Sequence, residues 1–332
     1  MGRATGSSLL IALVALAGAI RPAAATEVVK VATGAIVAEM APLWIGRDEG
    51  LYRRYGLDVQ ITPITAGLTA VQALLAGELH MISITGIPVA QANLGGADIL
   101  MIASVINLSP FSVMAARGVT TAQELKGKRL GITRFGSAAD IVARMALKRL
   151  GLEERDVTIV QIGGMGETLS AMQQGSVAAG MLTPPLTYRA EGLGFRELLN
   201  LAASGEPMLH TGMGATRAYL RSSRERVLAF LKGYIEAIAL FKRDRELAIR
   251  TVGKYMRMSD RVALERMYGF YREHLLDNPR PTAAGMKTIL DFIGRAQPEA
   301  LRVSPARYLD LSFLDELEAS GFLKRPAPEP GR

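Results

Sequence analysis

The apolar positions of this chain follow two periods. Short runs of aliphatic residues indicate buried strands, and stretches with apolar residues three or four apart indicate helices. The expected strands are 28–32, 57–61, 81–85, 99–105, 112–116, 129–133, 198–202 and 211–216. The expected helices among them are 38–49, 69–76 and 137–150. Strands that alternate with helices predict an α/β protein built on parallel sheets.

Part of this pattern occurs twice. Residues 58–85 align without a gap on residues 156–183, and seven of the 28 aligned positions are identical. Each copy has an apolar strand, a glycine-containing loop, a helix that ends at glycine, and a second strand that ends in threonine. The repeat predicts two similar α/β lobes whose loops face a shared cleft, an arrangement suited to closing on a small molecule.

The order of these segments predicts the domain organisation. We expect a first lobe of residues 26–114 and 214–332, and a second lobe of residues 115–213. No low-complexity linker separates the lobes, so the crossings near 112–118 and 211–216 would form a two-strand hinge.

Polar residues that precede apolar periodic stretches predict helix starts. The expected N-caps are Thr69, Ser137, Ser222, Ser259, Thr282 and Ser312. At Ser137, the carboxylate of Asp140 completes a capping box. From Ser222 onward the pattern is helical, and a short tail, 326–332, follows the last helix.

The first 25 residues have the pattern of a cleaved signal peptide. Arg3 precedes the apolar segment 9–20, and the alanines 23–25 offer a cleavage site after Ala25. Twelve apolar residues are too few to span a hydrocarbon core of about 30 Å. We therefore expect an exported, periplasmic protein.

Composition excludes several function classes. The chain has no cysteine, which rules out disulfides, thiolate metal sites and cysteine nucleophiles. Its three histidines have no metal-ligand spacing, so neither a metal nor a cofactor is expected. The excess of positive charge lies in residues 217–332, with 22 basic and 15 acidic side chains of mixed order. No aromatic interleaving accompanies it, so a nucleic-acid partner is not expected.

Three blocks resemble a known family. They are GRDEGLYRRYGLDVQI (46–61), AGLTAVQALLAGELHMISITGIP (66–88) and LKGKRLGITRFGSAADIVARMAL (125–147). The chain resembles, over residues 28–216, the sulfonate/nitrate/taurine-type substrate-binding proteins of ABC importers, a family that includes binding proteins for the thiamine pyrimidine precursor. The resemblance implies a type II periplasmic-binding-protein fold and a monomer that serves an ABC permease and its ATPase. His80 stands where the family usually has aspartate.

The ligand site is expected where strands end. Ligands of parallel α/β sheets bind beyond the carboxyl ends of strands, and helix N-termini there attract anions. The candidate ligand residues are Glu39, Met40, Gly67, Leu68, Thr69, Thr85, Gly86, Arg134, Phe135, Gly136, Ser137, Ala138, Thr183 and Pro184.

Most of these candidates also have a purely structural interpretation. Ser137 and Thr69 can cap helices as well as bind, and Thr85 and Thr183 can be turn formers. Glu39 can accept hydrogen bonds from an amino group of the ligand or only favour a helix N-terminus. His210 can face the cleft. Trp44 is interpreted as a core residue.

Three functions remain open. The first is an exported solute-binding protein that captures a small organic molecule, preferably with one anionic group such as a sulfonate or carboxylate, for an ABC importer. The second is a binding protein that reports to a membrane sensor. The third is an enzyme, since pyrimidine synthases resemble this family; however, those synthases use a cysteine-rich motif that this chain lacks. We therefore expect no catalytic activity.

Overall fold

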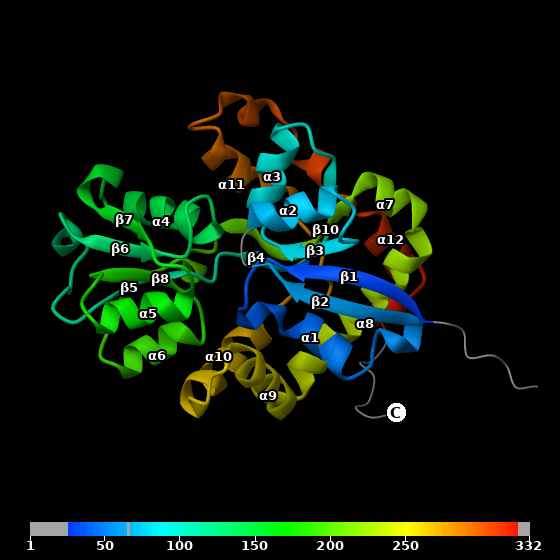
Figure 1. Ribbon diagram of the computed structural model, residues 1–332, viewed down its shortest axis with the longest axis horizontal. Coiled ribbons are helices and arrows are strands. Elements are labelled where there is room, and N and C mark those ends of the chain that lie inside the picture. Colours follow the sequence, from blue (N-terminus) through cyan, green and yellow to red (C-terminus); the bar gives the residue numbers. More distant parts are fainter. Residues whose placement is uncertain (1–25, 65–66, 325–332) are drawn as a thin grey trace, which may run out of the picture.

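The computed structural model describes residues 26–64 and 67–324. Outside the described residues lie the expected signal peptide, residue 66 and the tail 326–332. Within them the chain forms two five-stranded sheets, each covered by helices on both faces (Figure 1). This arrangement confirms the predicted α/β class and the two lobes.

The two sheets have the same topology. The first sheet runs in the order β2-β1-β3-β10-β4 and the second in the order β7-β6-β8-β5-β9. In each, the first three strands are parallel and the next strand is antiparallel to its neighbours. The strands of the first sheet are β1 Glu27–Thr33, β2 Leu57–Pro63, β3 Met81–Ile84, β4 Ile99–Leu108 and β10 Pro207–Thr216. Those of the second are β5 Ser112–Ala115, β6 Arg129–Ile132, β7 Thr158–Gln161, β8 Ala179–Leu182 and β9 Arg196–Asn200.

The sequence repeat corresponds to this shared topology. Its first copy forms β2, α2 and β3, and its second copy forms β7, α5 and β8. The two strands of each copy do not pair with each other, because the strand that precedes the copy, β1 or β6, lies between them.

The chain changes sheets at two places. β5 pairs only with strands of the second sheet, and β10 pairs only with strands of the first. We therefore propose that residues 109–111 and 201–206 are the crossing segments, a few residues before the boundaries expected after 114 and 213.

The helices complete each lobe. Those of the repeat regions are α1 Ala41–Asp48, α2 Gly67–Leu75, α3 Gly86–Leu94, α4 Ala138–Arg149, α5 Met165–Gln173 and α6 Leu186–Gly192. The C-terminal helices are α7 Arg217–Ser222, α8 Arg224–Arg243, α9 Arg245–Met256, α10 Arg261–His274, α11 Ala283–Ile293 and α12 Ser312–Ala319. α8 packs on α1, α11 packs on β10, and α10 contacts α6 of the second lobe (Figure 1). No described helix has the length and hydropathy of a membrane span.

The helix starts test the expected N-caps. The side chains of Ser137 and Thr282 accept bonds from backbone N–H groups of α4 and α11, as predicted. The other assignments are wrong. Those residues and their positions are Thr69, in the first turn of α2; Ser222, the last residue of α7; Ser259, one residue before the Asp260 cap of α10; and Ser312, already inside α12. Serine and threonine occur near helix starts in several positions, so sequence alone shifts the start by a few residues.

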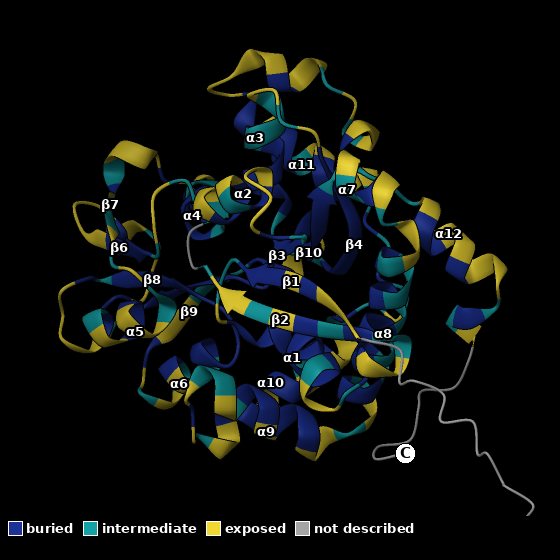
Figure 2. Ribbon diagram, turned by 45° about the vertical axis from the view of Figure 1, so that its right-hand side comes forward, coloured by how far each residue is buried: buried dark blue, intermediate teal, exposed yellow. Residues whose placement is uncertain are grey.

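The core lies on both faces of the sheets. The inner strands of both sheets are buried along most of their length, whereas the edge strands β2, β7 and β9 are mostly intermediate or exposed, and the outer faces of the helices are exposed (Figure 2). Trp44 is 3% exposed and stacks on Tyr255 with ring centroids 4.4 Å apart, which confirms its predicted core role.

Candidate ligand-binding site

The carboxyl ends of β1 and β8 meet where the lobes join. The chain after β1 forms a short 3-10 helix that buries Glu39, and Thr183 follows β8 directly. Tyr271 of α10 donates its hydroxyl to Glu39 Oε2 over 2.7 Å, whereas the hydroxyl of Thr183 donates to the sulfur of Met165 at 3.5 Å. Both segments follow strand ends, where ligands of parallel sheets are expected to bind, and α10 also contacts α6 of the second lobe.

Three buried polar side chains form a connected group. Glu39, His210 and Tyr271 are 1%, 3% and 0% exposed. His210 Nε2 lies 3.3 Å from Glu39 Oε1, so both carboxylate oxygens of Glu39 have protein partners. We call Glu39, His210 and Tyr271 the polar floor.

The protonation of Tyr271 follows from its surroundings. Burial raises the pKa of Tyr271 well above 10, and the charge and hydrogen bond of Glu39 raise it further. The phenol therefore keeps its proton and donates a hydrogen bond to the carboxylate of Glu39. A buried carboxylate needs such donors, because an unpaired charge away from water is costly.

One atom of the polar floor has no partner. His210 Nδ1 is buried and makes no hydrogen bond within the described part of the chain. The ring of Phe111 packs edge-on against the imidazole, with centroids 5.5 Å apart. On the second lobe, the buried hydroxyl of Thr187 in α6 likewise lacks a partner among the described residues.

The loop after β6 holds its own capping network. Ser137 Oγ donates to the carbonyl of Arg134 at 2.7 Å and accepts from Asp140 N at 3.4 Å. The Asp140 carboxylate accepts from Gly136 N, not from Ser137 N, so the capping box closes one residue earlier than expected. Gly136 has a φ of +74°, a conformation that side chains other than glycine rarely adopt. Phe135 is 56% exposed.

The first turns of α2 and α3 in the first lobe hold the next candidates. Leu68 is 48% exposed and Thr69 is also exposed, whereas Gly67 lies against Pro88. Thr85 precedes α3 without a side-chain cap bond. Gly86 is buried, and a Cβ there would lie 2.9 Å from Ile289, so only glycine fits without a shift.

The remaining candidates are buried. Met40 is 3% exposed, and its sulfur accepts from Ser83 Oγ at 3.1 Å. Pro184 is buried beside Thr183, in a cis peptide bond with Pro185, and Ala138 is half-buried at the start of α4. The structure joins Glu39 to Tyr271 and His210, and the ligand contacts of all the candidates stay predictions.

Sequence reasoning missed Tyr271. Its neighbours Leu264, Met267 and Tyr268 occupy the same buried side of α10, so the helical pattern marks it only as a core residue. The available signal was the tyrosine itself on a buried helix face, because a buried tyrosine hydroxyl needs a hydrogen-bond partner.

His80 has a structural role. Its Nδ1 accepts from the backbone N–H of Lys30 over 3.0 Å, and its ring stacks on Tyr219. Burial lowers the pKa of His80, and the charges of Arg226 and Lys30 lower it further. An aspartate at this position could accept the same backbone bond.

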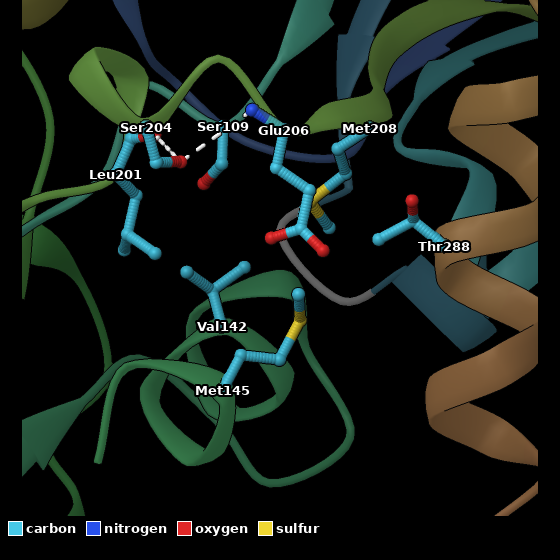
Figure 3. Close-up of a pocket in the computed structure, with 8 residues that line it drawn as sticks. All are labelled: Ser109, Val142, Met145, Leu201, Ser204, Glu206, Met208 and Thr288. Carbon is cyan, nitrogen blue, oxygen red and sulfur yellow. Dashed lines mark hydrogen bonds between the residues drawn. The ribbon is translucent and has the colours of Figure 1, made fainter. Parts of the chain in front are cut away.

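A small pocket of about 10 Å³, partly open to solvent, lies beside the crossing segments. Val142 and Met145 of α4 point toward Glu206 and Met208, with Thr288 of α11 opposite (Figure 3). None of the candidate ligand residues lines it. The described residues also contain no group of three or more acidic or histidine side chains that could hold a metal.

Comparison with known proteins places the chain in a family. The sequence model of the family described as NMT1/THI5 like matches residues 37–246, more than half of the chain. The chain belongs to this family. A Brucella abortus (strain 2308) protein named only as a candidate binding protein is 33% identical over 120 residues, which cover 36% of this chain and 36% of that protein.

Solved structures share the fold of this NMT1/THI5 like chain. The periplasmic aliphatic sulphonate binding protein of Escherichia coli is 19% identical with a TM-score of 0.69, over 92% of this chain and 94% of that one. The periplasmic nitrate-binding protein of Synechocystis PCC 6803 is 14% identical with a TM-score of 0.72, over 92% of both. The alkanesulfonate-binding protein of Xanthomonas axonopodis pv. citri is 21% identical with a TM-score of 0.69, over 86% and 98%. These likenesses confirm the predicted periplasmic-binding-protein fold.

Proposed function

We propose that this protein is an exported solute-binding protein that captures a small organic molecule between its lobes and delivers it to an ABC importer. The observation that carries the proposal is the polar floor, a buried, hydrogen-bonded group whose Tyr271 lies on α10, the helix that contacts α6 of the second lobe. The fold shared with sulfonate- and nitrate-binding proteins supports the same function.

The structure favours an organic ligand with both polar and apolar parts. Buried polar atoms lie at the floor, whereas large apolar side chains are exposed by Leu68, in the first turn of α2, and by Phe135, in the loop after β6. Helix N-termini at the same ends, those of α3 and α4 among them, favour one anionic group such as a sulfonate or carboxylate. Closure would then trap the ligand and create the form that the permease recognises.

The test is direct identification of a ligand. Protein purified after secretion is denatured, and the released small molecules are identified by mass spectrometry. The same protein is heated with alkanesulfonates, taurine, nitrate and aromatic carboxylates. A ligand at about 100 times its Kd stabilises the folded state by about 2.7 kcal/mol, which is a shift of several degrees in Tm.

Delivery needs a second measurement. Uptake of the identified ligand into cells that lack this protein should fall to the background rate and recover when the gene is restored. Ligand binding with unchanged uptake would contradict the importer role but leave the binding role standing. An absence of both released and added ligands would contradict the binding role itself.

A further inference from the structure

A groove lies among the C-terminal helices α8, α9 and α10. Its volume is about 680 Å³, a size typical of binding sites, and it is open to solvent. Three cationic side chains line it: Lys242 at the end of α8, Arg245 at the start of α9, and Arg272 of α10. No residue of the polar floor lines it, so it is a separate feature, which we call the C-terminal groove.

The charges of the C-terminal groove are only partly neutralised by the chain itself. The two ion pairs are Lys242 Nζ with Asp277 Oδ1 at 2.7 Å, and Arg245 Nη2 with Glu265 Oε1 at 3.2 Å. Arg272 and Glu273 also line the groove, and neither forms an ion pair within the described part of the chain. A partner that completes this pattern presents a carboxylate to Arg272 and a hydrogen-bond donor to Glu273.

One wall of the groove is a glycine inside a helix. Gly269 lies within α10, and glycine is the least favourable residue in a helix interior after proline. Packing does not explain it, because a Cβ at this position would meet no described atom within 4 Å outside its own turn of helix. A glycine without such a neighbour leaves the backbone of α10 open to close approach by another chain.

The groove adjoins the contact between the lobes. Gly269 follows Arg266 by three residues, on the same side of α10, and Arg266 contacts Tyr188 and Glu191 of α6. One turn before Arg266, the apolar side chain of Val262 is 69% exposed. The helices α6, α10 and α9 lie next to one another along one side of the molecule (Figure 2). A partner in the groove is therefore within reach of both lobes.

The mixture of charges favours a protein segment as the partner. A surface of anionic lipids or a nucleic acid presents negative charges alone, and these would face the carboxylates of Glu265 and Glu273 in the groove. A polypeptide offers carboxylates and N–H donors at fixed spacing, and protein interfaces use such complementary charges for specificity.

We propose that the C-terminal groove binds an extracytoplasmic segment of the ABC permease, with a carboxylate of that segment on Arg272 and its backbone against Gly269. The inference rests on the proposed function and adds the surface by which the transporter engages this protein. Because the groove lies beside the contact of α10 with α6, a partner bound there can detect whether the lobes are together.

Photo-crosslinking in the cells of the uptake measurement tests the contact. p-Benzoylphenylalanine replaces Val262 in the full-length secreted protein. The matched control position is Leu301, an aliphatic residue that is 58% exposed and does not line the groove. Illumination should link the Val262 probe, and not the Leu301 probe, to the permease. Mass spectrometry should locate the link in one extracytoplasmic segment that contains aspartate or glutamate.

Three variants of the Val262-probe protein locate the interaction. Arg272→Glu should lower the yield of the link at least about tenfold, because like charges would then face each other. Arg221→Glu makes the same change of charge at an exposed arginine of α7 outside the groove, and should leave the yield unchanged. Gly269→Gln should raise Tm by about 1 °C through its better helix propensity, yet lower the yield, because the new side chain occupies the groove.

The outcomes separate the two proposals. No link from the Val262 probe, or a link to phospholipid, to a second copy of this chain or to a protein other than the permease, would overturn the inference. Equal yields from the Val262 and Leu301 probes, or from Arg272→Glu and its parent, would also overturn it. All of these results leave ligand capture standing, since the released-ligand analysis tests capture separately. Failure of that analysis and of uptake would instead overturn the proposed function, and the inference with it.

Discussion

Arg266 links the two lobes in this structure, and its removal is expected to favour the open form. Its guanidinium carbon lies 4.0 Å from the ring centroid of Tyr188, and Nη1 lies 2.6 Å from Glu191 Oε2. Both partners belong to α6 of the second lobe, whereas Arg266 belongs to α10. These contacts exist only while α6 and α10 are together, so they stabilise the closed form alone.

The free energy that these contacts contribute follows from the exposure of the side chains. The Arg266 and Glu191 side chains are 48% and 34% exposed, so solvent screens the ion pair to about 0.5 kcal/mol. A cation over an aromatic face at a partly exposed site contributes about 1 kcal/mol. Arg266→Ala should therefore lower the closed-to-open ratio by about tenfold, which corresponds to about 1.4 kcal/mol.

Small-angle X-ray scattering of the unliganded protein measures this ratio. Arg266→Ala should increase the radius of gyration and weaken ligand binding by up to about tenfold, because affinity falls with the fraction of binding-competent protein. Arg272→Ala is the control, since Arg272 is an exposed arginine on the same helix. Identical scattering and affinity for Arg266→Ala and wild type would refute the assignment of Arg266 as an inter-lobe contact that favours closure.

Three further predictions concern stability. Tyr271→Phe removes a buried donor from Glu39, which should cost about 2 kcal/mol and lower Tm by about 3 °C in calorimetry; an unchanged Tm would contradict the polar floor. The pKa of His80 is lowered in the folded state, so the unfolded state binds a proton more readily and the free energy of unfolding should fall as the pH drops below 6.5. In urea titrations this fall should be weaker for His80→Asn, which keeps an acceptor for the N–H of Lys30. An equal fall in both proteins would show that His80 does not cause it. Gly136→Ala should destabilise by about 1 kcal/mol in the same titrations, because its φ is +74°; a stabilised variant would contradict that backbone conformation.

The fold could be predicted because its signals are local. Aliphatic runs, helical periods and the repeat depend on neighbouring residues, and the sheets contain the expected strands with ends shifted by at most a few residues. The helix starts at Ser222, Ser259 and Ser312 were wrong because several polar residues near each start could cap it. Neither hydrophobic periodicity nor helix capping predicts the order of the strands in a sheet, such as the position of β1 between β2 and β3.

The site could be predicted only in part because its contacts join distant residues. Glu39 and Tyr271 are separated by 232 positions, and Glu39 and His210 by 171. The rule that ligands bind at strand ends led to the candidates Glu39 and Thr183, whose ligand contacts stay predictions. No sequence pattern indicates that a helix after the second crossing supplies Tyr271 to the same place, since this residue fits the apolar face of α10.

The origin of the polar floor suggests an order of binding. All three of its residues come from the first lobe: Glu39 follows β1, His210 lies on β10, and Tyr271 lies on α10. We therefore expect the first lobe to engage a ligand before closure, and the second lobe to add its contacts afterwards. α10 also carries Arg266, so a single helix bears both a floor residue and the contact with α6. A ligand that changes the position of α10 would thereby change the inter-lobe contact, which provides a physical link between binding and closure.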